Sequence, residues 1–316
     1  MISGEKILVT GASGMVGLQL AKFLARDNEV WGASRFLAPE QRGSALTTAP
    51  EARTALDALN IRTAPADMAN GDFSALPQDF TYVLHLAHTR RPPTEFFEAT
   101  QANAIGAGKL LQHCRKAKAA LVVSSAAVYS PPQDPFHRLS ETDEIGRAWH
   151  PWAPTSPVSK VALEAVARFA AQAFDLPVTI MRLNTTYGPT AGMPITDMDD
   201  VAAGKTITVF ADPFPHTPIH FDDMCDQLEA LLDAASAQPA RIVNWCGDEV
   251  VTQREWCDLA GELSGRTAEL AVKSIPGLMN GNVCDNTRRM SITGPCKRPF
   301  RESYRQIYAA RHGARA

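Results

Sequence analysis

A glycine-rich loop near the start of the chain is the clearest candidate for a chemical site. Its residues are Gly11, Ala12, Ser13, Gly14, Met15, Val16 and Gly17. Between an apolar run and an amphipathic stretch, this Gly-x-x-Gly-x-x-Gly spacing is typical of a pyridine dinucleotide site. Gly11 permits the tight turn, Gly14 lets backbone N–H groups approach the pyrophosphate, and Gly17 lets the following helix pack on the strand. The loop therefore predicts that the chain binds NAD or NADP.

The choice between NAD and NADP depends on the end of the second expected strand. An NAD site commonly places a carboxylate there, whereas this chain has Ser34 and Arg35, with Arg42 nearby. A cation suits a 2′-phosphate, so the sequence favours NADP, although Arg35 is also compatible with stacking on adenine or with solvent. Asp67 and Met68, after the third strand, are candidate adenine contacts, and Asp67 is equally suited to capping its own loop.

Metal and disulfide chemistry are not expected. The six cysteines are irregularly spaced and include no C-x-x-C pair, which argues against a zinc cage or a disulfide framework. His216 and His220 have the spacing of metal ligands on a helix, but Pro215 and Pro218 rule out a regular helix there. We therefore expect no metal.

Composition limits the classes of partner. With 316 residues, 45% of them hydrophobic, the chain can bury one large core or two modest ones. A net charge of −3 without a basic run argues against nucleic acid. No apolar run reaches membrane-spanning length and no signal-like segment opens the chain, so we expect a cytoplasmic protein without membrane contact.

Alternating strand and helix patterns must position the site residues. Strands are expected at 6–10, 29–33, 82–87, 121–125 and 178–183, and helical patterns at about 16–24, 96–114, 158–174 and 221–235. Strands that are apolar on both faces and joined by helices predict an α/β fold with a doubly wound parallel Rossmann sheet. We expect this dinucleotide-binding domain to comprise residues 1–188 and about 219–247.

The regular alternation is interrupted twice. A proline-rich loop at residues 130–157 contains Trp149 and His150, and a loop of this length usually serves function. After residue 188 the density of Pro and Gly rises. We expect a smaller C-terminal α/β substrate lobe there, built from about 189–218 and 248–316.

Several separated motifs resemble those of the extended short-chain dehydrogenases/reductases, which include NAD-dependent sugar epimerases and dehydratases. The glycine loop has that family's spacing, and residues 83–87 resemble its fourth-strand motif. Residues 121–129 are similar to the strand that carries its catalytic serine, which maps to Ser125. Residues 182–189 and 219–223 resemble two substrate-side segments. Each match is weak alone, but their order and spacing together make the resemblance specific over nearly the whole chain.

The resemblance implies a site that extends beyond the glycine loop. It implies further cofactor contacts from Leu86, Ala87, His88, Asn103, Val123, Ser124, Lys160, Leu183, Asn184 and Thr185. The expected substrate contacts are His88, Ser125, Ala126, Trp149, His150, Asn184 and Tyr187. Arg182, Arg288 and Arg289 are candidates to meet an anionic small-molecule substrate such as a nucleotide diphosphate.

The sequence departs from the family at its catalytic pair. The family has Tyr-x-x-x-Lys on one helix; this chain supplies Lys160 but places Ser156 where the tyrosine stands. Positions four apart share a helix face, so the lysine can lower the phenol pKa while holding the nicotinamide ribose. Serine is shorter and far less acidic, and loss of a positioned acid costs about 10²- to 10⁴-fold in rate. By resemblance Lys160 keeps its ribose contact.

Three groups are candidates to replace the phenol. His88 follows the fourth-strand motif and carries an imidazole that titrates near neutral pH. Tyr129 lies four residues after Ser125, and His150 lies in the proline-rich loop. A water held by Ser125 and Ser156 is a fourth possibility. Each candidate also has a simpler interpretation: pocket lining for His88, packing for Tyr129 and solvent exposure for His150.

The leading hypothesis is an NAD(P)-dependent oxidoreductase or epimerase/dehydratase that acts on a hydroxyl or carbonyl group through a non-standard proton relay. Alternatives are a cofactor-assisted non-redox isomerase, lyase or cyclase, a non-enzymatic NADP(H) sensor, and an enzyme inactivated by substitution at Ser156. The family often dimerises through two helices of each subunit. The apolar faces of 94–117 and 158–174 therefore predict a homodimer.

Overall fold

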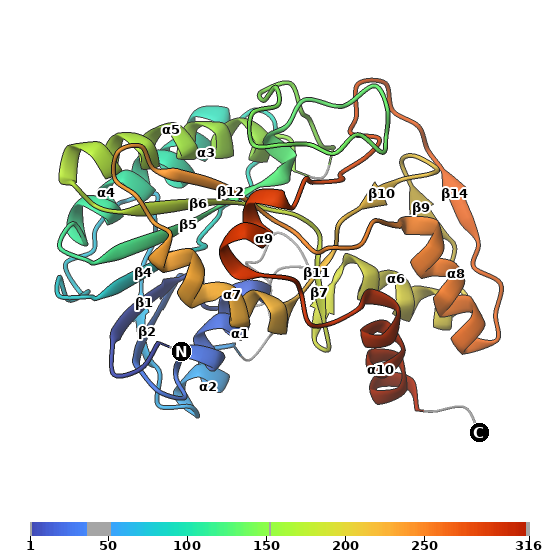
Figure 1. Cartoon of the computed structure of the whole chain (residues 1–316), viewed down its shortest axis with the longest axis horizontal. Coiled ribbons are helices and arrows are strands. Elements are labelled where there is room, and N and C mark those ends of the chain that lie inside the picture. The colour runs from blue at the N-terminus through green and yellow to red at the C-terminus, as the bar shows by residue number, and fades with distance from the viewer. Residues whose placement is uncertain (1, 37–51, 152, 314–316) are drawn as a thin grey trace.

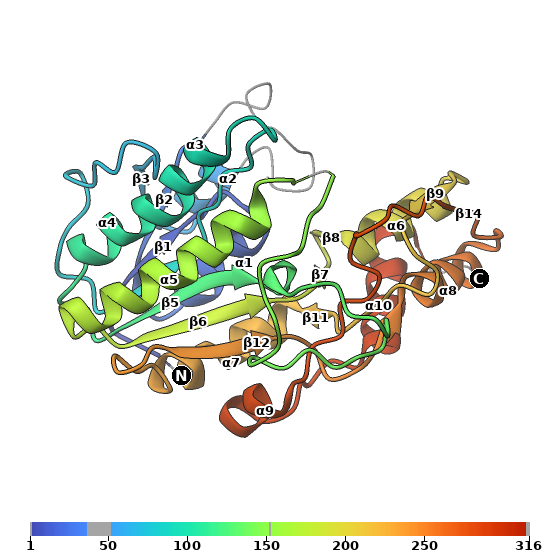
Figure 2. The same cartoon turned by 90° about the horizontal axis from the view of Figure 1, so that it is seen from above.

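A seven-stranded parallel sheet forms the centre of the molecule (Figures 1 and 2). The computed structural model of the chain describes residues 2–36, 52–151 and 153–313. The sheet strands are β1 (Lys6–Thr10), β2 (Glu29–Ser34), β3 (Arg62–Pro65), β4 (Tyr82–His85), β5 (Ala119–Ser125), β6 (Val178–Leu183) and β12 (Arg241–Trp245). Their spatial order is β12-β6-β5-β4-β1-β2-β3, so the chain changes direction across the sheet between β1 and β4. The predicted doubly wound Rossmann sheet is confirmed.

Helices cover both faces of this sheet because its strands are apolar on both sides. On one face lie α3 (Phe96–Thr100), α4 (Gly106–His113) and α5 (Ser156–Phe174), and on the other lie α1 (Met15–Leu24) and α7 (Phe221–Asp233) (Figure 2). The short helix α2 (Ala52–Asp57) lies beside β3 and α1. Strand β1 shows the alternation, since Ile7 and Val9 join the core under α1 and α7 whereas Leu8 joins the core under α4 and α5.

The expected helix over residues 96–114 is divided in three. Between α3 and α4 the chain forms a π-helical turn, Gln101–Ile105. Single π turns inside helices are frequent at functional sites, because the extra residue turns a side chain out of register. Asn103 lies in this turn and is buried.

A smaller lobe lies beyond the carboxyl ends of β5 and β6 (Figure 2). Its elements are β7 (Thr186–Gly188), β8 (Ala191–Gly192), α6 (Met193–Ala202), β9 (Ile207–Val209), β10 (Pro215–His216), β11 (Ile219–His220), β13 (Val251–Thr252), α8 (Gln253–Ser264), β14 (Leu270–Val272) and α10 (Phe300–His312). An aromatic core that includes Tyr187, Trp256, Phe300 and Tyr304 fills it. Helix α9 (Thr287–Thr293) lies instead against α7 and β12 (Figure 1).

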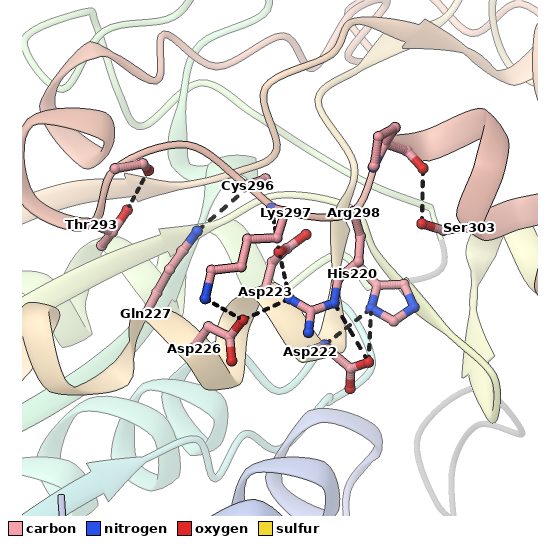
Figure 3. Close-up of polar contacts among 12 residues, drawn as sticks. His220, Asp222, Asp223, Asp226, Gln227, Thr293, Cys296, Lys297, Arg298 and Ser303 are labelled. Atoms are coloured by element: carbon pink, nitrogen blue, oxygen red, sulfur yellow. Dashed lines mark hydrogen bonds and ion pairs between the residues drawn. The ribbon is translucent and has the colours of Figure 1, made fainter. Parts of the chain in front are cut away.

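An ionic clamp fastens the last segment of the chain to α7 (Figure 3). The Arg298 guanidinium lies 2.9 Å from the Asp223 carboxylate and 2.7 Å from the Asp226 carboxylate. The Lys297 ammonium lies 3.2 Å from Asp226, and the Lys297 backbone N–H donates to Asp223 at 2.8 Å. Because Asp223 is buried, these contacts give its carboxylate the partners that it needs.

A buried ion pair joins α5 to the sheet. Glu164 of α5 accepts hydrogen bonds from Arg182 of β6 at 3.0 and 2.9 Å, and the two side chains are 5% and 3% exposed. Ser124 of β5 donates a further hydrogen bond to Glu164 at 2.7 Å. The Arg182 guanidinium also lies over the Tyr129 ring, 4.8 Å from its centroid.

Across the described ranges, the structure contains no helix of the length and apolarity that a membrane span requires.

Glu164→Gln is expected to destabilise the fold by about 3–5 kcal/mol, because it leaves the Arg182 charge buried without its counter-ion. Urea unfolding followed by circular dichroism measures the change. Glu262→Gln is the matched control. Glu262 also pairs with arginine, through Arg301 and Arg305, but it is 57% exposed, so the loss of stability is expected to be below about 1 kcal/mol. Equal losses of stability in the two variants would contradict the conclusion that the buried Glu164–Arg182 pair is needed for the fold.

Candidate active site

The glycine loop leaves β1 at the switch point of the sheet and lies against the segment that leaves β4. Gly11 has φ +70°, and a Cβ there would lie 2.8 Å from the Ala87 backbone N. A Cβ on Gly17 would overlap the Gly11 carbonyl oxygen. Gly14 begins α1 without a side-chain cap, and the first turn carries no acidic residue, so its N–H groups face a region suited to an anion. These features fit a dinucleotide pyrophosphate.

The end of β2 contacts the glycine loop through side chains. The hydroxyls of Ser13 and Ser34 share a hydrogen bond, and Arg35, the next residue, is exposed. Arg42 lies outside the described residues. The other predicted adenine-side residues have local roles: the Asp67 carboxylate accepts from the Ala69 N–H at 3.0 Å, and Met68 is buried. Asp67 therefore caps its own loop.

Lys160 lies on the inner face of α5, buried against the end of β5. Its ammonium donates a hydrogen bond to the Val123 carbonyl at 2.6 Å. Burial lowers its pKa to about 8, and the Glu164 carboxylate opposes that shift. A cation in this position suits the dinucleotide ribose that the resemblance implies for it.

Ser156 is the first residue of α5, one turn before Lys160, and it meets His88. The distance from Ser156 Oγ to His88 Nε2 is 2.7 Å. Burial, together with the charges of Lys160 and Arg90, holds the pKa of His88 well below its usual range. The imidazole is therefore neutral near pH 7. Of the three groups considered as replacements for the phenol, His88 is the one that the structure brings to Ser156.

The loop that carries His88 is fixed on both sides of it. Asn103 accepts from the Thr89 N–H at 2.7 Å and donates to the Thr89 carbonyl at 2.8 Å. Thr155, the residue before α5, donates to the Arg91 carbonyl at 3.0 Å and accepts from the Arg91 N–H at 3.3 Å. Asn103 therefore positions the His88 loop, and its side chain also donates to Ser159 Oγ at 3.1 Å.

The serines at the end of β5 point in different directions. Ser124 is buried and donates to Glu164, so its side chain supports the ion pair. Ser125 is partly buried and its hydroxyl accepts from the Ala127 N–H at 3.1 Å, which caps the short 3₁₀ turn Ala126–Val128. Ala126 is buried.

Tyr129 is held in a structural contact away from Ser156. Its phenol is fully buried and donates to Asn244 Oδ1 at 2.6 Å. Burial raises its pKa, and the adjacent Arg182 guanidinium opposes that shift. The Tyr129 hydroxyl therefore uses its proton in a hydrogen bond to β12.

Asn184 and Tyr187 also differ from expectation. The Asn184 side chain donates to the Asn282 carbonyl and to Cys284 Sγ, and it accepts from the backbone N–H groups of Thr185 and Thr217. These contacts use the hydrogen-bonding capacity of the amide and join the lobe to the end of β6. Tyr187 is buried in the lobe core, 4.9 Å from the Phe300 ring centroid.

The neighbours of Asn184 remain partly exposed. Leu183 packs at the edge of the core, and Thr185 shares a hydrogen bond with His216 Nδ1 at 2.8 Å. His220 caps α7 by accepting from the Asp222 N–H at 3.1 Å. The two histidines with metal-like spacing thus have separate local partners.

The three arginines predicted to meet an anionic substrate are all engaged within the protein. Arg182 pairs with Glu164. Arg288 donates to the Ile242 carbonyl at 2.8 Å and lies 3.7 Å from Glu141. Arg289 is fully buried and pairs with Asp248. Arg182 and Arg289 are buried in structural pairs, whereas the Arg288 side chain is 41% exposed, and its contact with an anionic substrate stays a prediction.

The proline-rich loop folds back onto the lobe. The Tyr129 and Ile145 backbones form a bridge, and Leu139 bridges to Cys284. Trp149 is 41% exposed, and His150 is partly buried with its pKa lowered by burial to about 4. Both remain candidates for substrate contact.

Sequence reasoning missed two threonines that shape the site. The Thr10 hydroxyl shares a hydrogen bond with His85 Nδ1 at 2.9 Å and accepts from the Ala87 N–H at 3.3 Å, which orients the exit of β4. Thr155 holds the Arg91 backbone. Thr10 is detectable as a polar residue at the end of an apolar strand, directly before the glycine loop, whereas Thr155 has no comparable signal.

The sequence pattern of the NAD dependent epimerase/dehydratase family matches residues 7–246. This chain belongs to that family. The resemblance to extended short-chain dehydrogenases/reductases is thereby confirmed, and with it, at the level of the family, an enzyme that uses a nicotinamide dinucleotide.

The chain is similar to one relative in sequence and to two solved structures in fold. An uncharacterized UDP-glucose epimerase, YtcB, of Bacillus subtilis (strain 168) is 30% identical over 196 residues, which span 58% of this chain and 57% of the relative. A mutant UDP-glucuronic acid 4-epimerase from Bacillus cereus, in complex with a fluorinated UDP-glucuronic acid and NAD, matches with a TM-score of 0.80 and 23% identity over 96% of this chain and 98% of that one. UDP-glucose 4-epimerase of Thermus thermophilus, in complex with NAD, matches with a TM-score of 0.77 and 21% identity over 98% and 100%.

Gly11→Ala is expected to weaken binding of the nicotinamide dinucleotide at least about tenfold, or ~1.4 kcal/mol, because the new methyl pushes the glycine loop away from Ala87. Fluorescence titration measures the dissociation constant. Gly4→Ala is the control: Gly4 has φ +71°, but a Cβ added there would meet nothing within 4 Å, so it bears the backbone strain alone. Normal binding by Gly11→Ala would show that the dinucleotide does not use this loop.

Proposed function

We propose that this chain is a nicotinamide-dinucleotide-dependent enzyme that oxidises and reduces a hydroxyl- or carbonyl-bearing carbon of a small molecule, with nucleotide sugars as the substrate class. The observation that carries the proposal is the position of His88, which directly follows the segment packed against the glycine loop and contacts Ser156, one turn before Lys160. The UDP-sugar epimerases similar to this chain support the choice of substrate class.

Each residue of the site has a distinct task in this proposal. Bound nicotinamide would supply the two-electron acceptor and donor. The glycine loop and the first turn of α1 hold the pyrophosphate, and Lys160 holds the ribose and adds positive charge beside the reacting carbon. His88 and Ser156 handle the proton of the reacting oxygen, while Ser125 offers a hydroxyl from the neighbouring strand end.

NADP is the proposed form of the dinucleotide. The end of β2 carries no carboxylate at Ser34, Arg35 or Phe36, whereas an NAD site commonly has one to accept the ribose hydroxyls. The exposed Arg35 guanidinium instead suits a 2′-phosphate. The structural relatives named above were solved with NAD, so the two cofactors are the appropriate pair to compare.

The purified chain is expected to convert at least one member of a panel of UDP-glucose, UDP-glucuronic acid and UDP-N-acetylglucosamine, with transient reduction of bound nicotinamide. Sugar products are followed by NMR and the nicotinamide by absorbance, with NAD and NADP in parallel. NADP is expected to bind at least about tenfold more tightly, and Arg35→Ser to remove that preference, which corresponds to ~1.4 kcal/mol.

Two results would replace the proposal with another function. Product formation that persists with a dinucleotide that cannot be reduced identifies a non-redox isomerase, lyase or cyclase. Dinucleotide binding without turnover of the sugar nucleotides or of a wider panel of aldehydes, ketones and alcohols identifies a sensor.

We further propose that two copies of the chain associate through α3 and α5. These neighbouring elements and the turn between α3 and α4 expose large apolar side chains: Phe96, Phe97, Ile105, Val158 and Phe169. Phe97 and Phe169 are 79% and 67% exposed, which is unusual for phenylalanine on a free surface. A twofold contact of the same helices from each copy would cover them.

Phe97→Asp and Phe169→Asp are each expected to convert the dimer to a monomer, because an aspartate would be desolvated in the apolar contact. Light scattering after size exclusion gives the mass. Phe136→Asp, a substitution of a 47% exposed phenylalanine in the proline-rich loop, is expected to leave the mass unchanged. A monomeric wild-type chain at micromolar concentration would overturn the dimer.

A further inference from the structure

We propose that His88 and Ser156 form a proton relay, in which His88 takes up the proton of the substrate's reacting hydroxyl through the Ser156 hydroxyl and later returns it. The pair assigns to two residues on separate elements the task that a single phenol on α5 performs elsewhere in the family. The inference rests on the proposed function and specifies how the proton moves.

The geometry of the pair supports transfer toward the imidazole. At 2.7 Å from Ser156 Oγ, His88 Nε2 is within hydrogen-bond range for accepting the serine proton if the neutral ring carries its own proton on Nδ1. His88 Nδ1 is buried and has no hydrogen-bond partner among the described residues. Among the described residues, no carboxylate therefore accepts a hydrogen bond from His88 Nδ1 to stabilise the charged ring. The imidazolium is a short-lived proton carrier for this reason.

The charged and titratable groups around His88 also favour a neutral resting state. Lys160 faces it from α5, Arg90 from its own loop and His85 from the end of β4. These groups add positive charge or are themselves neutral and buried, which opposes a second stable positive charge. His88 is thus in its neutral, proton-accepting form across the neutral range, and because its pKa is low it returns an accepted proton readily.

Hydrogen bonds to the backbone hold both His88 and Ser156, which keeps their side chains within hydrogen-bond distance. The hydrogen bonds of Asn103 to Thr89 and of Thr155 to Arg91 fix the loop on either side of His88. The Ser156 backbone N–H donates to the Ala153 carbonyl at 3.0 Å, and the Ser156 carbonyl accepts from the Ser159 hydroxyl at 3.1 Å. A relay needs such rigid support, because proton transfer depends steeply on donor–acceptor distance.

The step balances in atoms and electrons. The substrate O–H bond breaks as a new O–H bond forms at Ser156, while the original Ser156 O–H bond breaks as an N–H bond forms at His88 Nε2. The electron pair of the substrate C–H bond passes to the oxidised nicotinamide, so the carbon becomes a carbonyl. The reverse transfers restore the hydroxyl, the serine and the neutral imidazole.

The activity test uses five variants with the full chain and bound dinucleotide. Ser156→Ala and His88→Asn are each expected to lower kcat about 10²- to 10⁴-fold with little change in KM, and the double variant to be no slower than the slower single one. Ser156→Tyr restores a phenol one turn before Lys160. Its rate is therefore expected to become insensitive to a second substitution, His88→Asn.

The pH profile separates a relay from a structural role. The oxidation step requires neutral His88, whose pKa is lowered, so kcat is expected to stay level as the pH falls to about 6.5, the ordinary histidine pKa, and to decline only below it. In Ser156→Tyr the acid limb is expected to move to higher pH, because a phenolate is then required. His137→Asn, at an exposed histidine in the proline-rich loop, is the matched control and is expected to change neither profile.

A readout without turnover tests the pair itself. In the dinucleotide-bound protein labelled with ¹⁵N-histidine, NMR is expected to show the Nδ1–H tautomer of His88, and Ser156→Ala is expected to change its Nε2 shift. An unchanged shift, or wild-type activity in His88→Asn, overturns the relay while leaving the proposed function intact. Absence of turnover by the wild-type chain overturns the proposed function, even where the NMR result shows that the pair exists.

Discussion

The buried ion pair between Glu164 and Arg182 is the constraint on which the geometry of the site depends. It ties α5, which carries Ser156 and Lys160, to β6, and through Ser124 it also includes β5. Two charges this deep are stable only while each satisfies the other, so the helix has one permitted position along the sheet. That position places Lys160 at the end of β5.

The fold was predictable because it depends on local, repeated signals. Apolar runs, helical spacing and the three glycines of the loop each follow from short stretches of sequence, and their order specifies a doubly wound sheet. The π-helical turn at Asn103 was not visible, because an inserted residue leaves the apolar spacing of 96–114 nearly unchanged. The family resemblance succeeded for the same reason as the fold, since its motifs lie at the strand ends.

The site was predictable in its chemistry but less so in its pairing. The sequence placed His88 among the candidate proton carriers, yet its contact with Ser156 joins residues 68 positions apart and leaves no periodic signal. Tyr129, Asn184 and Arg289 had suitable chemical types, but distant partners occupy them: Asn244, segments 282–284 and Asp248. A polar side chain near a site is available for ligands only if the fold has not already used its hydrogen bonds.

The clamp between α7 and residues 297–298 bears on the order in which the molecule is assembled during synthesis. The strands of the Rossmann sheet, from β1 to β12, are complete once residue 245 has been made. The lobe core needs Phe300 and Tyr304, and the buried Asp223 needs Arg298, all of which are made more than fifty residues after β12 ends. Until they are made, the nascent chain carries an incomplete lobe core and an Asp223 carboxylate without its cation, and surfaces of this kind are prone to misassembly.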